Sequence, residues 1–133
     1  MDITAIVVSS SAGHEVTVRT GAVSQSLAVP AKAAGTGSAI NGGEFLMLAL
    51  ATCYCNDLYR EAARLDVSIT SVKVEATAHF PGIGLAATDI RYRATVDSTS
   101  SPEAVARLIR ETDAVAEVHN TIRAGVPVEL SMT

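Results

Sequence analysis

The chain has 133 residues, a length that suits one domain with one hydrophobic core, so we predict a single domain over residues 1–133. Its net charge of −4 argues against binding to nucleic acid or to an anionic membrane surface. Hydrophobic residues make up 48% and charged residues only 18%, so we expect a partner subunit to cover much apolar surface. A secretory signal has a basic segment followed by an apolar one, and the N-terminus lacks this pattern. We therefore predict a cytoplasmic protein with reduced thiols.

The first part of the chain predicts strands. Residues 3–9 are rich in β-branched residues, and residues 14–19 alternate apolar and polar side chains as a half-buried strand does. A turn signal at Thr20 and Gly21 leads into a further strand over residues 23–29. The small residues that follow, 31–40, predict a loop.

A long helix over residues 41–65 is the central element of the predicted fold. Asn41 is a good N-cap, and Glu44 three residues later completes a capping box. From Phe45 to Cys55 only Thr52 interrupts an apolar run, which is too short to span a bilayer. A helix that is apolar on every side must be covered on every side, so we expect it in the middle of the molecule.

The second part of the chain predicts a pair of strands and then helices. Ser101 at an N-cap and Pro102 at the first helical position start a helix, and we expect a break or bend near Thr112. In chain order the expected elements are strands 67–80 and 86–96, helical segments from 102 and over 114–122, and a final strand 126–132. The segregation of strands and helices predicts an α+β fold. One small sheet cannot cover the long helix, so we expect a dimer.

Several segments resemble the OsmC/Ohr family, the osmotically induced and organic-hydroperoxide-resistance proteins. They are Asn-Gly-Gly-Glu-Phe-Leu from Asn41, Leu-Ala-Leu-Ala-Thr-Cys up to Cys53, and Asn-Thr-Ile-Arg-Ala-Gly-Val-Pro-Val from Asn120. The resemblance implies an OsmC-like fold in which a long central helix packs on antiparallel sheets within an intertwined homodimer. It also implies a thiol peroxidase that reduces organic hydroperoxides and is reduced by a dithiol. We expect no cofactor, and no metal either, because structural zinc prefers ligand pairs across a loop and the two cysteines form an i, i+2 pair on one helix.

The resemblance also implies candidate catalytic residues. Cys53 falls on the position of the peroxide-attacking cysteine. A glutamate and an arginine lower the thiolate pKa in such proteins. Here Glu44 lies one residue later than the expected glutamate, and Arg19 is the only arginine before the helix. The resolving cysteine should lie within residues 116–119, where none is present.

Each candidate residue also has a plain structural interpretation. Cys53 suits a small buried hydrophobe, Glu44 a capping partner, and Arg19 a solvated strand residue. His119 could pair with Cys53 as a base, or it could be a surface histidine. Cys55 should not bridge to Cys53, because residues two apart on a helix diverge by about 200°. Polar pairs on the helix itself are expected to be ordinary neighbours of little energetic value: Asp57 with Arg60, and Glu61 with Arg64.

The sequence leaves more than one function open. The first is a peroxidase that acts through Cys53, with an external thiol as the resolving partner. The second is a catalytically degenerate relative that binds a small apolar ligand at the dimer interface, because the resolving cysteine is missing and Glu44 is displaced. A structural dimer without a small-molecule site is a third interpretation.

Overall fold

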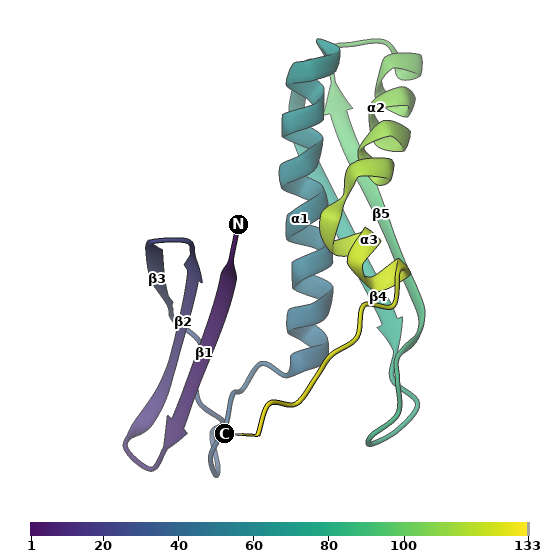
Figure 1. Cartoon of the computed structure of the whole chain (residues 1–133). Coiled ribbons are helices and arrows are strands. Elements are labelled where there is room, and N and C mark those ends of the chain that lie inside the picture. The colour runs from purple at the N-terminus through teal and green to yellow at the C-terminus, as the bar shows by residue number, and fades with distance from the viewer. Residues whose placement is uncertain (133) are drawn as a thin grey trace. The chain divides into compact units, whose positions relative to one another are not determined.

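The computed structural model describes residues 1–132 and divides into two compact units (Figure 1). One unit is Met1–Phe45 and the other begins at Leu46, so the boundary falls in the first turn of the long helix. Helices and antiparallel strands occur together, which confirms the α+β class. The single domain over residues 1–133 stays a prediction.

The N-terminal unit is built on a three-stranded antiparallel sheet. Strands β1 (Ile3–Ser10), β2 (Gly13–Thr20) and β3 (Val23–Leu27) follow one another in space as they do in sequence. Gly21 sits in the β2–β3 turn with φ +55, a backbone conformation that favours glycine. The predicted strands are confirmed, with the third ending before Pro30.

The capping box at the start of helix α1 (Gly42–Leu65) is formed as predicted. The Asn41 backbone N–H donates to Glu44 Oε2 at 2.8 Å, and the Glu44 N–H donates to Asn41 Oδ1 at 2.9 Å. These two bonds satisfy groups that the helix itself cannot pair. Despite its length, neither α1 nor any other helix within residues 1–132 is apolar enough over a sufficient length to cross a membrane.

The C-terminal unit packs helices on one face of a two-stranded antiparallel ribbon. Strands β4 (Ile69–His79) and β5 (Thr88–Ser98) form the ribbon, and α2 (Pro102–Val115) and α3 (Glu117–Arg123) follow it. The Ser101 side chain accepts the Ala104 N–H at 3.2 Å, which confirms the predicted helix start. Apolar side chains of β4 and β5 that point toward the helices alternate with exposed ones.

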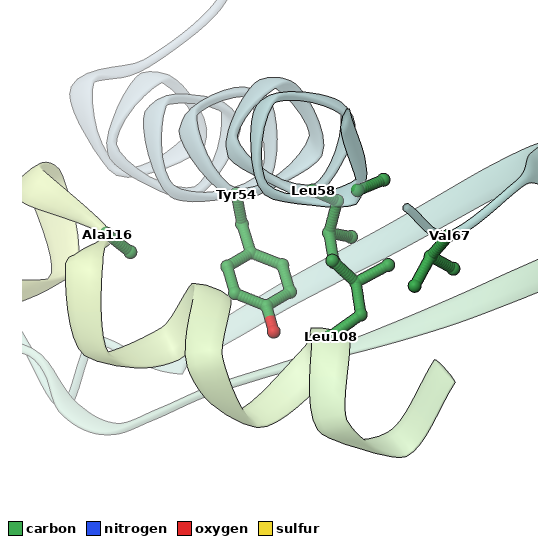
Figure 2. Close-up of a cluster of buried hydrophobic side chains, with 6 residues drawn as sticks. Tyr54, Leu58, Val67, Leu108 and Ala116 are labelled. Carbon is green, nitrogen blue, oxygen red and sulfur yellow. The ribbon is translucent and has the colours of Figure 1, made fainter. Parts of the chain in front are cut away.

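The core of this unit lies between α1, α2 and the ribbon (Figure 2). Leu58 and Leu108 are fully buried, and Tyr54 is 1% exposed. The Tyr54 ring lies within the cluster while its hydroxyl donates to the carbonyl oxygen of Ile109 at 2.6 Å. Burial of such side chains stabilises a fold by about 1.5–3 kcal/mol each, so this cluster fixes the face that α1 turns toward α2.

The bend between α2 and α3 lies at Ala116 and not near Thr112. Thr112 stays helical, and its hydroxyl donates to the Leu108 carbonyl oxygen of the preceding turn at 2.8 Å. Ala116 is extended (φ −75, ψ 103) and fully buried. The corner is held by Arg123, whose Nη2 lies 2.6 Å from Asp113 Oδ1.

Two further contacts tie this corner to the rest of the unit. The Tyr92 hydroxyl of β5 donates to Asp113, and Asn120 Nδ2 donates to the Ala114 carbonyl oxygen at 3.1 Å. The corner therefore connects the end of α2, the middle of α3 and strand β5. This packing sets the position of Glu117, the first residue of α3.

The predicted last strand over residues 126–132 is not formed within the described chain. Its alternating apolar residues are exposed: Val126 55%, Val128 100%, Leu130 86% and Met132 84%. The alternation alone does not make a strand, because a strand needs a neighbouring edge to pair with. Leu48 of α1 is also 56% exposed. One chain therefore leaves part of the helix uncovered, in line with the prediction that one small sheet cannot cover it.

Candidate thiol site on helix α1

Cys53 lies in the middle of α1 with two carboxylates beside it. Its thiol donates to Oδ2 of Asp57, one turn further along the helix, at 3.4 Å. Its Sγ also lies 3.9 Å from Oε2 of Glu117, the first residue of α3. The side chain is partly buried and the thiol is free. The bend at Ala116 and the helical spacing together bring both carboxylates to this sulfur.

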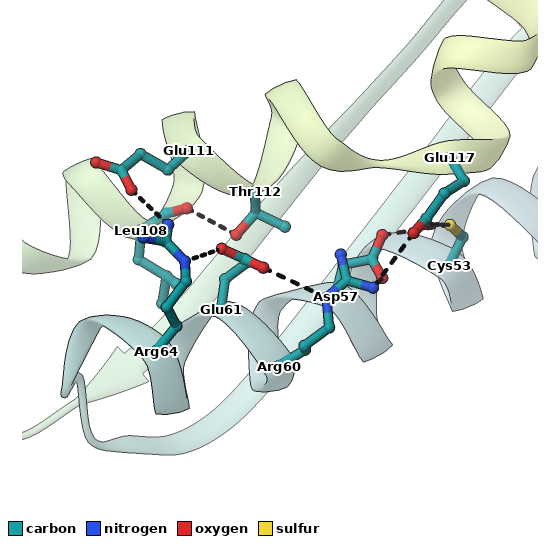
Figure 3. A network of polar contacts seen from close by, with 9 residues as sticks. All are labelled: Cys53, Asp57, Arg60, Glu61, Arg64, Leu108, Glu111, Thr112 and Glu117. Carbon is teal, nitrogen blue, oxygen red and sulfur yellow. Dashed lines mark hydrogen bonds and ion pairs between the residues drawn. The ribbon is translucent and has the colours of Figure 1, made fainter.

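Arg60 joins these carboxylates to a third one (Figure 3). Its Nη1 lies 2.8 Å from Asp57 Oδ1 and 3.4 Å from Glu117 Oε1, and its Nε lies 3.3 Å from Glu61 Oε1. The Asp57 side chain is only 6% exposed, whereas that of Arg60 is 49% exposed. Asp57 therefore uses one oxygen for the guanidinium and the other for the thiol.

The pKa of the Cys53 thiol is raised above its usual value. Burial is the largest cause, and the hydrogen bond to Asp57 and the charges of Asp57 and Glu117 act in the same direction. A backbone hydrogen bond from Val118 opposes them. The resemblance implied a thiolate stabilised by neighbouring groups, whereas the described neighbours favour the protonated thiol.

The pKa of Asp57 is also raised. Burial is the largest cause, and the Glu117 charge adds to it, although the hydrogen bond from Cys53 and the charges of Arg60 and His119 act in the opposite direction. A carboxyl group with a raised pKa holds a proton more readily than one in water. The thiol and its hydrogen-bond acceptor are therefore both shifted toward their neutral forms.

The same polar network continues along α1, without a thiol. Arg64 Nε lies 2.6 Å from Glu61 Oε2, its Nη2 lies 2.6 Å from Glu111 Oε2, and Arg107 Nε lies 2.6 Å from Glu111 Oε1 (Figure 3). The arginine hydrogen bonds hold the pKa values of Glu61 and Glu111 below their usual range. In this part of the network, the arginines have a larger effect on the carboxylate pKa values than burial does.

A sulfur and two carboxylates are also possible metal ligands. The ligand atoms of Cys53, Asp57 and Glu117 lie within 4.8 Å of one another. Arg60 already binds both carboxylates, and a cation there would compete with the guanidinium. We therefore assign no metal to this cluster.

The other predicted catalytic residues belong to the N-terminal unit. Glu44 forms the capping box with Asn41, and Arg19 is an exposed residue of β2 opposite Thr4 and Ser24. These positions agree with the plain structural interpretations of both residues. Catalytic roles for Glu44 and Arg19 beside Cys53 stay predictions.

Cys55 and His119 have surroundings that differ from each other. Cys55 is free and partly buried, and no disulfide joins it to Cys53. His119 is 3% exposed, so its interpretation as a surface histidine is wrong. Its ring lies against Tyr54 and Tyr92, with centroids 5.6 Å and 4.3 Å away, and burial lowers its pKa.

Sequence reasoning did not single out Asp57, Arg60 or Glu117 as site residues. The spacing of Cys53, Asp57 and Arg60 placed them on one helix face, and this was the available signal. Glu117 carried no such signal, because it lies 64 residues from Cys53 in sequence. It occupies the segment in which the resemblance placed a resolving cysteine.

A long helix that carries a free cysteine and packs on an antiparallel ribbon defines an α+β thiol protein. The model of the OsmC-like protein family matches residues 35–131, and the chain belongs to that family. No curated protein matches the chain.

Solved structures of this family share the fold. An OsmC-like protein from Mycoplasma pneumoniae aligns with a TM-score of 0.62 at 20% identity, over 92% of this chain and 86% of that one. An organic hydroperoxide resistance protein OsmC from Legionella pneumophila aligns with a TM-score of 0.59 at 21% identity, over 95% and 93%. An organic hydroperoxide resistance protein from Elizabethkingia anophelis gives 0.61 at 16% identity, over 92% and 89%. At 16–21% identity, these similarities show that the chain shares the fold of these proteins.

Proposed function

We propose that this protein is an OsmC-like thiol peroxidase that reduces organic hydroperoxides at Cys53. The observation that carries the proposal is a free, partly exposed thiol hydrogen-bonded to a buried acid, Asp57, in the helix that defines the family. Two of the similar structures are described as organic hydroperoxide resistance proteins, which supports the choice of substrate.

The proposed reaction oxidises one cysteine. The sulfur attacks the terminal peroxide oxygen, the O–O bond breaks, and an alcohol and a Cys53 sulfenic acid are formed. The only other cysteine, Cys55, is on the same helix and forms no bridge to Cys53. An external dithiol therefore condenses with the sulfenic acid, releases water, and then closes its own disulfide to free the thiol. No cofactor enters this cycle.

The proposal includes a homodimer in the cytoplasm. Exposed apolar residues that a second copy would cover occur in β1 and in the C-terminal segment, and they include Ile3 at 70%, Val7 at 60% and Val128 at 100%. Patches of this kind are typical of subunit interfaces. Light scattering coupled to gel filtration should give twice the monomer mass of 13.7 kDa. A monomer at micromolar concentration would contradict the dimer.

The test of the activity compares single-cysteine variants. The parent, Cys53→Ser and Cys55→Ser are mixed with cumene hydroperoxide and dihydrolipoamide, and peroxide loss is followed. We expect Cys55→Ser to turn over like the parent and Cys53→Ser to lose turnover. Equal turnover by Cys53→Ser would refute the proposal.

A second function is favoured by the raised pKa of the Cys53 thiol. A protein of this family that kept its thiol protonated could bind a small apolar ligand at the dimer interface without reducing peroxides. Mass spectrometry after peroxide treatment separates the two functions. Stable over-oxidation of Cys53 without turnover supports ligand binding, whereas a sulfenic acid that dithiols reverse supports the peroxidase.

A further inference from the structure

A protonated thiol is a poor nucleophile, so the proposed reaction needs a route for the Cys53 proton. The sulfur must lose this proton as it attacks the peroxide, and the departing alkoxide must gain one. The hydrogen-bond acceptor of the thiol is Oδ2 of Asp57 at 3.4 Å, a geometry that suits proton transfer along an existing contact. No other carboxylate in the described chain accepts a hydrogen bond this short from Cys53.

We propose that Asp57 is the proton shuttle of this site. Its carboxylate takes the Cys53 proton during attack on the hydroperoxide and returns that proton to the departing alkoxide. The inference rests on the proposed peroxidase function and deepens it by assigning a catalytic acid–base residue. It places that residue on α1 itself, one turn from the thiol, and not in the N-terminal unit that holds Glu44 and Arg19.

The atoms and electrons of the step balance. The S–H bond breaks and its proton moves to Asp57 Oδ2, while a sulfur electron pair forms the new S–O bond. The O–O bond breaks, and its electron pair leaves with the alkoxide, RO⁻. The attacked oxygen keeps its hydrogen and becomes the sulfenic hydroxyl, and Asp57 gives its proton to RO⁻. The products are therefore Cys53–SOH and ROH, and Asp57 is again a carboxylate.

The contacts of Asp57 distinguish it from the other acids of the network. Arg60 holds Oδ1 at 2.8 Å, which leaves Oδ2 directed at the thiol. Glu117 lies farther from the sulfur, at 3.9 Å, and its side chain is 69% exposed. Glu61 is slightly less buried than Asp57, with side chains 9% and 6% exposed, and it bonds only to Arg60 and Arg64. Asp57 alone combines burial with a contact to the reacting atom.

The protonation of Asp57 gives the reaction a pH dependence. The groups that face its carboxylate are Cys53 and Arg60 on α1 and Glu117 and His119 on α3. A base must be ionised to accept a proton, so the peroxide reaction should slow as the pH falls through the pKa of Asp57. That pKa lies above the ordinary value of 3.8, mainly because of burial.

The experiment is Asp57→Asn in a Cys55→Ser background, with two readouts. The first is the rate constant for one equivalent of cumene hydroperoxide, followed by loss of free thiol. The second is the thiol pKa, followed by thiolate absorbance during a pH titration. General acid–base groups contribute about 10²–10⁴-fold, so we expect a rate at pH 7 about a hundredfold lower. The thiol pKa should fall at the same time, because an acceptor and a negative charge are removed.

The two readouts separate a shuttle from a merely repulsive neighbour. If Asp57 only disfavoured the thiolate, Asp57→Asn would gain thiolate and react faster, and this result would overturn the inference. Glu61→Gln is the matched control, since it removes a buried carboxylate from the same helix without touching Cys53, and it should react like the parent. Should Asp57→Asn fail to fold, the pH profile of the Cys55→Ser protein decides. A shuttle gives a rate that levels off once the pH exceeds the raised pKa of Asp57, whereas a rate that keeps rising tenfold per pH unit up to the thiol pKa would overturn the inference.

Failure of this inference is distinguishable from failure of the proposed function. Turnover by Cys53→Ser equal to that of the parent would remove the peroxidase proposal and the shuttle with it. An inert Cys53→Ser protein together with an unimpaired Asp57→Asn protein would leave the peroxidase in place and remove only the shuttle.

Discussion

The polar face of α1 has two halves built from the same residue types, and they behave in opposite ways. In one half, Asp57 and Glu117 outnumber the single cation Arg60 and flank a thiol. In the other, Glu61 and Glu111 share Arg60, Arg64 and Arg107 (Figure 3). The pKa of Asp57 is raised, whereas those of Glu61 and Glu111 are lowered. Burial and the local count of cations therefore decide the direction of the pKa shift, not the presence of an ion pair.

The largest expected effect comes from replacing an acid beside the thiol with a cation, so that cations outnumber acids there as they do in the other half of the network. Glu117→Lys replaces an anion 3.9 Å from Cys53 with a cation. An opposite charge at this range shifts a pKa by about 1–3 units, so the thiolate fraction at pH 7 should rise at least about tenfold. The rate of alkylation by iodoacetamide in a Cys55→Ser background measures this thiolate fraction. An unchanged alkylation rate would show that Glu117 does not act on the thiol in solution.

Removing the shared cation should affect both halves at once. Arg60→Met keeps much of the side-chain length but leaves Asp57, Glu61 and Glu117 without their common partner. Because Asp57 is buried, its uncompensated charge should lower Tm at pH 7. The loss of Tm should diminish in acid as Asp57, whose pKa is raised, takes up a proton, and calorimetry at pH 7 and at acidic pH measures this. The exposed Arg91→Met, whose nearest acid is Asp89 at 3.7 Å, serves as control and should change Tm little.

The smallest effect is a pair of stability changes of opposite sign. The folded state binds the proton of Asp57 more tightly than the unfolded chain does, so the contribution of Asp57 to stability weakens as the pH rises through its raised pKa. Glu61 is the reverse case. Its contribution is present above the ordinary pKa of 4.5 and is lost as the pH falls through its lowered value.

At pH 7, Asp57→Asn should therefore leave Tm unchanged or raise it slightly, whereas Glu61→Gln should lower it. Both substitutions are isosteric and both remove one contact to Arg60. Thermal unfolding followed by circular dichroism measures both variants side by side. Equal losses of Tm would mean that the two halves of the network do not differ as described.

Local chemistry made most of the fold predictable. The capping residues Asn41 and Glu44 determine where α1 begins, and Ser101 with Pro102 determines where α2 begins. The predicted bend near Thr112 is wrong in its position, because the tertiary packing of Ala116 decides where the chain turns. The strand over residues 126–132 could not be decided from alternation, since its pairing edge is not a local property.

The candidate site was predictable only in part, for a similar reason. Cys53 stood out through its place in the helix, and Asp57 and Arg60 followed it at helical spacing. The sign of their effect depends on burial and on Glu117, which only the turn at Ala116 brings to the sulfur. A family comparison supplies the nucleophile, but not the neighbours that set its protonation.

The corner between α2 and α3 also has a dynamic consequence. Asp113 of α2 binds both Arg123 of α3 and Tyr92 of β5, so the corner cannot open without breaking one of these two contacts. Local unfolding of this corner would carry Glu117 away from Cys53 and leave the thiol with Asp57 alone. Amide hydrogen exchange at residues 116–119 would then report how often the sulfur exchanges one electrostatic environment for another.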